Sequence, residues 1–268
     1  MIKKMMKTAL IAVIMVSFTV NGMAQKNLAR ISESGELRVG MTASQPPFSM
    51  KAIDGSVIGY DADLAMVLAE SMGVTLKIVE TPFSQLLEAL EKGEIDIIMS
   101  GMTITMERNM KVAFVGPYIL SGKSILTRST DFSKTEESEE LNANTVRLAV
   151  LKGSTSETYA KMEMPDAEIA LVDNYDEAVN MLIEGKTDIM VADFPICAYQ
   201  ALVHPEKGLI TLAEPLTIEP IGVAISPNDP LLLNLVENYM SSLAMIGILD
   251  ALEIKWFESG EWLDLVKE

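Results

Sequence analysis

A short pattern occurs twice in this chain and indicates that its two halves fold alike. In residues 90–98 an apolar helical segment ends at Gly93, and an aspartate then begins an apolar strand. Residues 182–190 repeat the same order, with the glycine at Gly185. Glycine commonly lies just past a helix end because it adopts the left-handed backbone conformation without strain. The repeat therefore predicts an α/β protein of two lobes built on one plan.

The patterns around the two copies place the lobes along the chain. Apolar strand patterns alternate with helical patterns on both sides of residues 129–144, a run rich in charged residues and in Ser and Thr. This alternation is typical of a mixed, doubly wound sheet flanked by helices. We expect the chain to cross between the lobes near residues 124–130 and again near 214–222. The expected ranges are 25–127 with 219–268 for lobe 1, and 128–218 for lobe 2.

The first residues have the pattern of a secretory signal peptide. Lys3, Lys4 and Lys7 precede an apolar segment at residues 9–20, and small residues follow where a signal peptidase would read them. The apolar segment is short for a membrane-spanning helix, which needs about 20 residues. We therefore expect residues 1–24 to be removed. Because no cysteine follows that point directly, we expect no lipid anchor and a location in the periplasm.

The composition is acidic, with 38 Asp and Glu against 21 Lys and Arg. A chain without basic clusters disfavours nucleic acid as a partner, because binding depends on cations that neutralise phosphates. The single histidine, His204, lies in a turn-like stretch, and the single cysteine, Cys197, lies in an apolar segment as a buried thiol would. Asp61 and Asp63 begin a predicted helix, where acids usually cap or oppose the helix dipole. The sequence thus predicts no metal site and no cofactor.

Polar groups that suit a bound carboxylate follow the strand predicted at residues 95–99. They are Ser100, Gly101, Thr103 and Arg108. Arginine presents a rigid fork of donors that matches two carboxylate oxygens, and open α/β sheets bind ligands beyond the carboxyl ends of their strands. Taken alone, Arg108 could instead form a solvated pair with Glu107 of little energetic value.

The second half offers a matching set of groups. Ser154 and Thr155 follow a glycine at a predicted helix start, where free backbone N–H groups favour an anion. A simple helix cap is the alternative for this motif. Asp193 ends the strand of the second repeat, as Ser100 ends the first, so both ends can face one cleft. Asp193 could also cap the helix that follows it.

Several ordered motifs resemble those of one protein family. They are GYDADL at 59–64, GMTITMER at 101–108, FVGPY at 114–118, GST at 153–155 with Asp193, and KWF at 255–257. Together they resemble the bacterial extracellular solute-binding proteins of the polar amino-acid ABC transporter type (solute-binding protein family 3). The resemblance implies the type II fold of periplasmic binding proteins, with two lobes that close on a ligand. It implies a binding protein rather than an enzyme.

The resemblance also implies roles for individual residues. Arg108 would hold the α-carboxylate of a free amino acid, helped by Thr103 and by Ser154 and Thr155. The α-ammonium would pair with Asp193, and Ser100 or Gly101 would accept a further hydrogen bond. Phe83 would form one wall of the pocket, with core packing as its alternative. The loop at 43–48 would lie over the ligand through Gln45.

Two positions depart from what the family implies. Gln45 stands where an aromatic residue is often found, and Thr42 stands where binders of cationic amino acids carry an acid. Both differences favour a polar or small neutral ligand. The implied partner is the membrane permease of an ABC importer, and we expect the protein to be a monomer. A signalling receptor is the alternative partner. The rival function is a periplasmic cyclohexadienyl dehydratase acting on arogenate or prephenate, since some relatives on this fold look like such enzymes.

Overall fold

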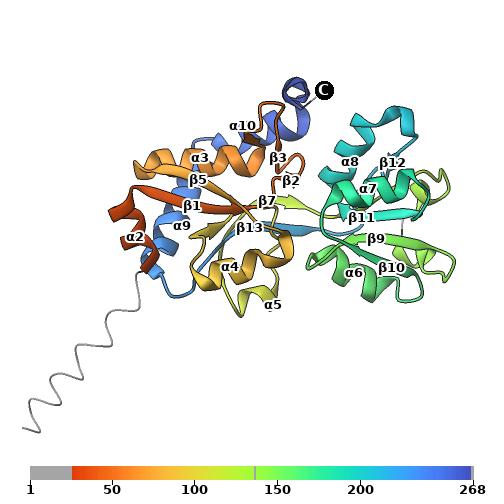
Figure 1. Ribbon diagram of the computed structural model, residues 1–268, viewed down its shortest axis with the longest axis horizontal. Coiled ribbons are helices and arrows are strands. Elements are labelled where there is room, and N and C mark those ends of the chain that lie inside the picture. The colour runs from red at the N-terminus through yellow and green to blue at the C-terminus, as the bar shows by residue number, and fades with distance from the viewer. Residues whose placement is uncertain (1–25, 136, 267–268) are drawn as a thin grey trace, which may run out of the picture.

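The computed structural model describes residues 26–135 and 137–266, and it shows two α/β lobes side by side (Figure 1). The expected signal peptide, residues 1–24, lies outside the described residues. Each lobe is built around a five-stranded mixed sheet flanked by helices. The predicted fold class, a two-lobed type II arrangement, is therefore confirmed.

The sheet of lobe 1 has the strand order β5-β1-β6-β13-β7. Its strands are β1 (Glu36–Met41), β5 (Thr75–Glu80), β6 (Ile97–Ile98), β7 (Ala113–Ser121) and β13 (Glu219–Ile225). Strands β5, β1 and β6 are parallel, whereas β13 runs antiparallel to both of its neighbours. The last part of the chain therefore completes the lobe that the first part began.

Helices cover the sheet of lobe 1, and a small sheet lies at its edge. The helices are α2 (Lys26–Ser34), α3 (Tyr60–Met72), α4 (Leu86–Lys92), α5 (Met106–Asn109), α9 (Pro230–Met245) and α10 (Ile248–Glu253), and the small sheet joins β2 (Ser44–Gln45), β3 (Ser49–Lys51) and β4 (Val57–Ile58). In the described part of the chain no single helix is long and apolar enough to cross a membrane. The bent pair Pro230–Met245 and Ile248–Glu258 meets that test by length and composition only.

The sheet of lobe 2 repeats the plan of lobe 1 in the order β10-β9-β11-β8-β12. Its elements are β8 (Lys123–Thr127), β9 (Arg147–Leu151), α6 (Thr155–Glu163), β10 (Glu168–Val172), α7 (Tyr175–Ile183), β11 (Ile189–Asp193), α8 (Phe194–Val203) and β12 (Ile210–Thr211). Three parallel strands, β10, β9 and β11, are again followed by an antiparallel one, β8. The two lobes thus share one strand plan, as the repeat predicted.

The aspartate of each repeat makes the same kind of contact in its own lobe. Asp96 accepts hydrogen bonds from the backbone and the guanidinium of Arg38 on β1. Asp188 accepts the same two kinds of bond from Arg147 on β9. Each aspartate therefore ties the start of its own strand to the neighbouring central strand.

The first crossing between the lobes lies earlier than predicted. Strand β8 (Lys123–Thr127) pairs with β11 in the sheet of lobe 2, so its assignment to lobe 1 was wrong. The crossing falls at Gly122, between β7 and β8. The sequence concealed it because only one residue, Gly122, separates the two apolar strands. A side chain at Gly122 would lie 1.9 Å from the carbonyl oxygen of Thr217, so the two crossing segments pack closely.

Candidate ligand-binding site

The structure brings the predicted polar residues of both lobes to the place where the lobes meet. Lobe 1 contributes Arg108 from α5 and Thr103 from the loop after β6. Lobe 2 contributes Thr155 at the start of α6 and Asp193 at the end of β11. These positions lie beyond strand ends, where open α/β sheets place their ligands.

Arg108 is buried and its side chain bridges the lobes. Its Nη1 donates to the Thr103 carbonyl oxygen at 2.9 Å, and its Nη2 donates to the Gly153 carbonyl oxygen of lobe 2 at 3.1 Å. The guanidinium also lies over the ring of Phe83, 5.6 Å from its centroid. Burial lowers the pKa of Arg108, although nearby carboxylates oppose that effect. The alternative of a solvated pair with Glu107 is therefore wrong.

The hydroxyls of Thr103 and Thr155 meet across the lobe boundary. Their Oγ1 atoms are 3.2 Å apart, and each hydroxyl donates to Oε2 of Glu219 at 3.0 Å. Glu219 is the first residue of β13, just after the chain returns to lobe 1. A carboxylate of this chain thus occupies donors that were predicted to serve a ligand carboxylate.

Lys123 places an ammonium group in the same cluster. It begins β8, and its Nζ donates to Asp193 Oδ1 and, at 2.8 Å, to Glu219 Oε2. The Lys123 side chain is only 1% exposed. Burial alone would lower its pKa, but Asp193 and Glu219 outweigh burial and raise it. Lys123 therefore stays charged inside the cleft, as a pair partner of two carboxylates.

Asp193 is held by this ion pair and not by the following helix. Its side chain makes no capping hydrogen bond to α8, so the cap alternative is wrong. Burial raises the pKa of Asp193, and the Lys123 ammonium opposes that rise. Burial would also raise the pKa of Glu219, but Lys123 and the threonine hydroxyls outweigh it and lower that pKa. The cleft thus holds two carboxylates and two cations, each with a partner.

The other predicted residues make contacts within their own lobes. Ser154 caps α6, since its hydroxyl accepts from the Glu157 backbone N–H at 3.2 Å. Ser100 donates to Gln45 Oε1 at 2.8 Å, and Thr42 donates to the same oxygen at 2.9 Å. Gln45 is therefore tied to the loop after β1, and Ser154 serves the helix start. Of the second-lobe pair, it is Thr155 whose hydroxyl reaches the inter-lobe cluster.

Gly101 owes its position to a buried aspartate. Its backbone N–H donates to Asp61 Oδ2 at 2.7 Å, and its φ of 57° lies in the left-handed region that favours glycine. Asp61 also accepts from the Tyr118 hydroxyl at 2.6 Å. Burial raises the pKa of Asp61 to about 7, although both hydrogen bonds oppose this effect. Asp61 thus holds the loop before Thr103 in place. The sequence had predicted only a role at the start of the helix.

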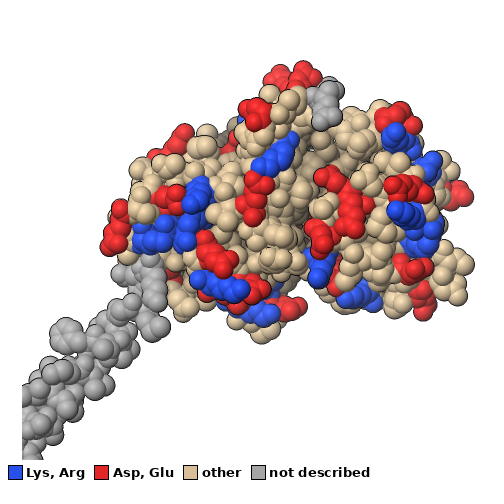
Figure 2. Space-filling view, in the orientation of Figure 1, with Lys and Arg blue, Asp and Glu red and all other residues tan. Residues whose placement is uncertain are grey.

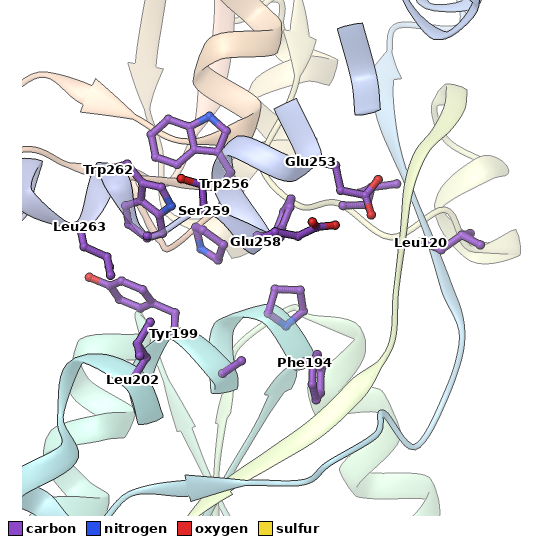
Figure 3. A pocket seen from close by; sticks show the side chains of 16 residues that line it. Leu120, Phe194, Tyr199, Leu202, Glu253, Trp256, Glu258, Ser259, Trp262 and Leu263 are labelled. Atoms are coloured by element: carbon purple, nitrogen blue, oxygen red, sulfur yellow. The ribbon is translucent and has the colours of Figure 1, made fainter. Parts of the chain in front are cut away.

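Hollows lie between the lobes at several places. One, of about 480 Å³, is lined by Arg108, Thr155 and Glu219 and opens beside the charged cluster. Another, of about 270 Å³, is largely apolar and lies between α8 and the C-terminal segment (Figure 3). There Tyr199 of lobe 2 stacks on Trp262 of lobe 1, with ring centroids 5.5 Å apart. A third, of about 490 Å³, lies between the loop at 43–46 and α8. Arg108 and Thr155 line the first of these hollows.

Charged side chains also cover the outside of both lobes. On the face that Figure 2 shows, Lys and Arg are interspersed with Asp and Glu. Among residues 26–135 and 137–266, no group of three or more His, Cys, Asp or Glu side chains could hold a metal ion.

Lys123 and Glu219 were not predicted as site residues. Each is a single charged residue at the start of an apolar strand, and they are 96 positions apart along the chain. Their one shared feature is that each lies next to a crossing between the lobes. Because the first crossing was placed too late, that signal was lost.

Residues 37–259 match the family of bacterial extracellular solute-binding proteins, family 3, and the chain belongs to this family. It is 29% identical to the cyclohexadienyl dehydratase of Pseudomonas aeruginosa over 234 residues, and this alignment covers 87% of each chain. Most of the named relatives are binding proteins.

Solved structures with the same fold include proteins of higher identity. An ancestral amino acid-binding protein, described as a precursor of cyclohexadienyl dehydratase, is 40% identical, with a TM-score of 0.80 over 86% of this chain and 99% of that one. A putative binding component of an ABC transporter from Wolinella succinogenes, complexed with lysine, is 36% identical, with a TM-score of 0.81 over 86% and 99%.

Proposed function

We propose that this protein is a periplasmic receptor that closes its two lobes on a free amino acid and delivers it, as a monomer, to the permease of an ABC importer. The observation that carries the proposal is the buried guanidinium of Arg108. It contacts both lobes and lies near a buried carboxylate, Asp193. A cation and an anion fixed in one cleft complement the two α-substituents of an amino acid better than the hydroxyls of a sugar.

Binding would drive closure because the ligand would touch both lobes. Arg108 and Thr103 belong to lobe 1, whereas Thr155 and Asp193 belong to lobe 2. A ligand held by all four stabilises only the closed arrangement, which is the logic of hinge closure. The amino acid-binding and ABC-transporter descriptions of the relatives support this assignment. The closed form would then present surfaces of both lobes together to the permease.

The enzymatic alternative is a cyclohexadienyl dehydratase, which the similarity to such an enzyme favours. Elimination of water needs a general acid that carries a proton near the leaving hydroxyl. The two cleft carboxylates, Asp193 and Glu219, both accept hydrogen bonds from the Lys123 ammonium. This pairing lowers the pKa of Glu219, whereas burial raises the pKa of Asp193 in spite of it. Since Asp193 is the group that we assign to the α-ammonium of the ligand, and most of the named relatives are binding proteins, we favour binding over acid catalysis.

The test is thermal unfolding of the purified protein against all common amino acids, with arogenate and prephenate added. A ligand that binds only the folded state stabilises it by about 2.7 kcal/mol at a hundredfold excess over its dissociation constant. We expect one or a few amino acids to raise the unfolding midpoint and to be recovered unchanged. Lack of any shift across the amino acids would contradict the proposal. Release of phenylpyruvate or phenylalanine from the added acids would establish the dehydratase instead.

A further inference from the structure

Lys123 and Glu219 come from the two segments that join the lobes. Lys123 follows the crossing residue Gly122 and begins β8, and Glu219 begins β13 after the return crossing. In the sheets Lys123 lies opposite Asp193, and Glu219 lies opposite Ser121. The crossings thus introduce one cation and one anion beside the predicted ligand groups.

Both charges are enclosed and each needs a partner. The Lys123 and Glu219 side chains are 1% and 14% exposed, and Nζ lies 2.8 Å from Oε2. An unpaired charge in such a place is strongly unfavourable, since burial removes its hydration. Any ligand that enters must therefore leave every charge in the cleft with a partner.

Four charges form the cluster where the lobes meet, and these four sum to zero. Arg108 and Lys123 are the cations, and Asp193 and Glu219 are the anions. When the α-carboxylate of an amino acid pairs with Arg108 and its α-ammonium pairs with Asp193, Lys123 and Glu219 are left to each other. A charged ligand side chain placed against this cluster would then find no unpaired counterion among its four members. Other charged residues, among them Glu107, Lys111 and Glu163, line the hollow farther out.

We propose that the Lys123–Glu219 pair keeps the charge cluster of the cleft balanced, and that this balance selects amino acids whose side chains carry no charge. This inference rests on the proposed function and adds the substrate class to it. On binding, the ligand carboxylate takes the hydroxyls of Thr103 and Thr155 from Glu219, and Glu219 turns wholly to Lys123. The pair thus serves as a filter at the hinge, in contrast to an ion pair that only joins the lobes.

Pairs of ligands that match in shape and differ in charge test the filter in the wild-type protein. The pairs are glutamine with glutamate, asparagine with aspartate, citrulline with arginine, and serine with 2,3-diaminopropionate, and each is titrated calorimetrically. In every pair that binds, we expect the neutral member to bind more tightly by about tenfold or more. Equal or tighter binding of the charged member would overturn the inference while leaving the proposed function intact. Absence of binding by every amino acid tested would overturn both.

Single variants should shift this preference in opposite directions. Glu219→Gln leaves one cation in excess. It is expected to raise the affinity for the anionic ligand of a pair, relative to the neutral one, by about tenfold. Lys123→Gln leaves one anion in excess and should improve the cationic member by a similar factor. The double variant, Lys123→Gln with Glu219→Gln, should restore the neutral preference. Failure of the double variant to do so would contradict a role for the pair.

An exposed pair supplies the matched control. Glu88 and Lys92 form an i,i+4 pair on α4, with both side chains more than half exposed. Glu88→Gln and Lys92→Gln make the same charge changes away from the cleft, and we expect them to leave every ratio unchanged. If the ratio of neutral to charged ligand affinity changed equally in control and cleft variants, the net charge of the protein alone would explain it. That result would overturn the inference. If a single cleft variant fails to fold, the wild-type ratios still decide the question.

Discussion

Replacing Arg108 with alanine is expected to abolish amino-acid binding. Arg108 supplies the charge for the ligand carboxylate and also links the lobes through the Gly153 carbonyl oxygen. Removing one partner of a buried, hydrogen-bonded charge pair costs about 2–5 kcal/mol, which is about a thirty- to several-thousandfold loss of affinity. Calorimetric titration with the amino acid found by the unfolding screen measures this loss.

Two further variants separate the role of the guanidinium from its charge. Arg108→Lys keeps the charge but loses the fork that holds two oxygens, so we expect it to bind far more weakly than the wild type. Arg128→Ala removes an exposed arginine that donates to the Ile183 carbonyl oxygen, and it should bind normally. Wild-type affinity in Arg108→Ala would exclude Arg108 as the carboxylate partner.

Replacing Asp193 with asparagine is expected to cause a loss of similar size. Asparagine keeps the shape of the side chain but not the charge that pairs with the ligand α-ammonium. Because Lys123 retains Glu219 as a partner at 2.8 Å, the variant leaves no cation of the protein unpaired. We therefore expect the ligand affinity to fall by about 2–5 kcal/mol while the fold is retained.

The control for this variant is an exposed aspartate of the same lobe. Asp173→Asn makes the same chemical change just before α7, outside the cleft, and should bind like the wild type. Thermal unfolding without ligand checks that Asp193→Asn is folded. A folded Asp193→Asn protein that binds with wild-type affinity would mean that the ammonium group lies elsewhere.

The sequence predicted the fold well where local signals were strong. Gly93 and Gly185 end their helices in the left-handed conformation, each with a φ of 71°, and the apolar strands that follow join matching sheets. The arginines that the repeated aspartates bind, Arg38 and Arg147, were not predicted, because their contacts join segments that are distant along the chain. The crossing at Gly122 was missed because a single residue separates β7 from β8, so the two strands read as one apolar segment.

The candidate site was predicted in part for the same reason. Arg108 and Asp193 follow strand ends, so the topology of an open sheet placed them near one cleft. Lys123 and Glu219 escaped notice because their pairing depends on how two separate crossings pack. Gln45 and Ser100 were expected at the ligand, but their hydrogen bonds join them to each other. Local pattern thus located the binding groups, whereas the charges that balance them required the three-dimensional structure.

The cleft is proposed to hold both α-substituents of one amino acid. Calorimetric titration of the wild-type protein tests it most directly, with the amino acid from the screen, its α-carboxamide and its des-amino acid as probes. We expect each analogue to bind more weakly by about 2–5 kcal/mol, because each lacks one of the two charges that Arg108 and Asp193 are proposed to bind. Equal affinity of the amino acid and either analogue would contradict the assignment of that group.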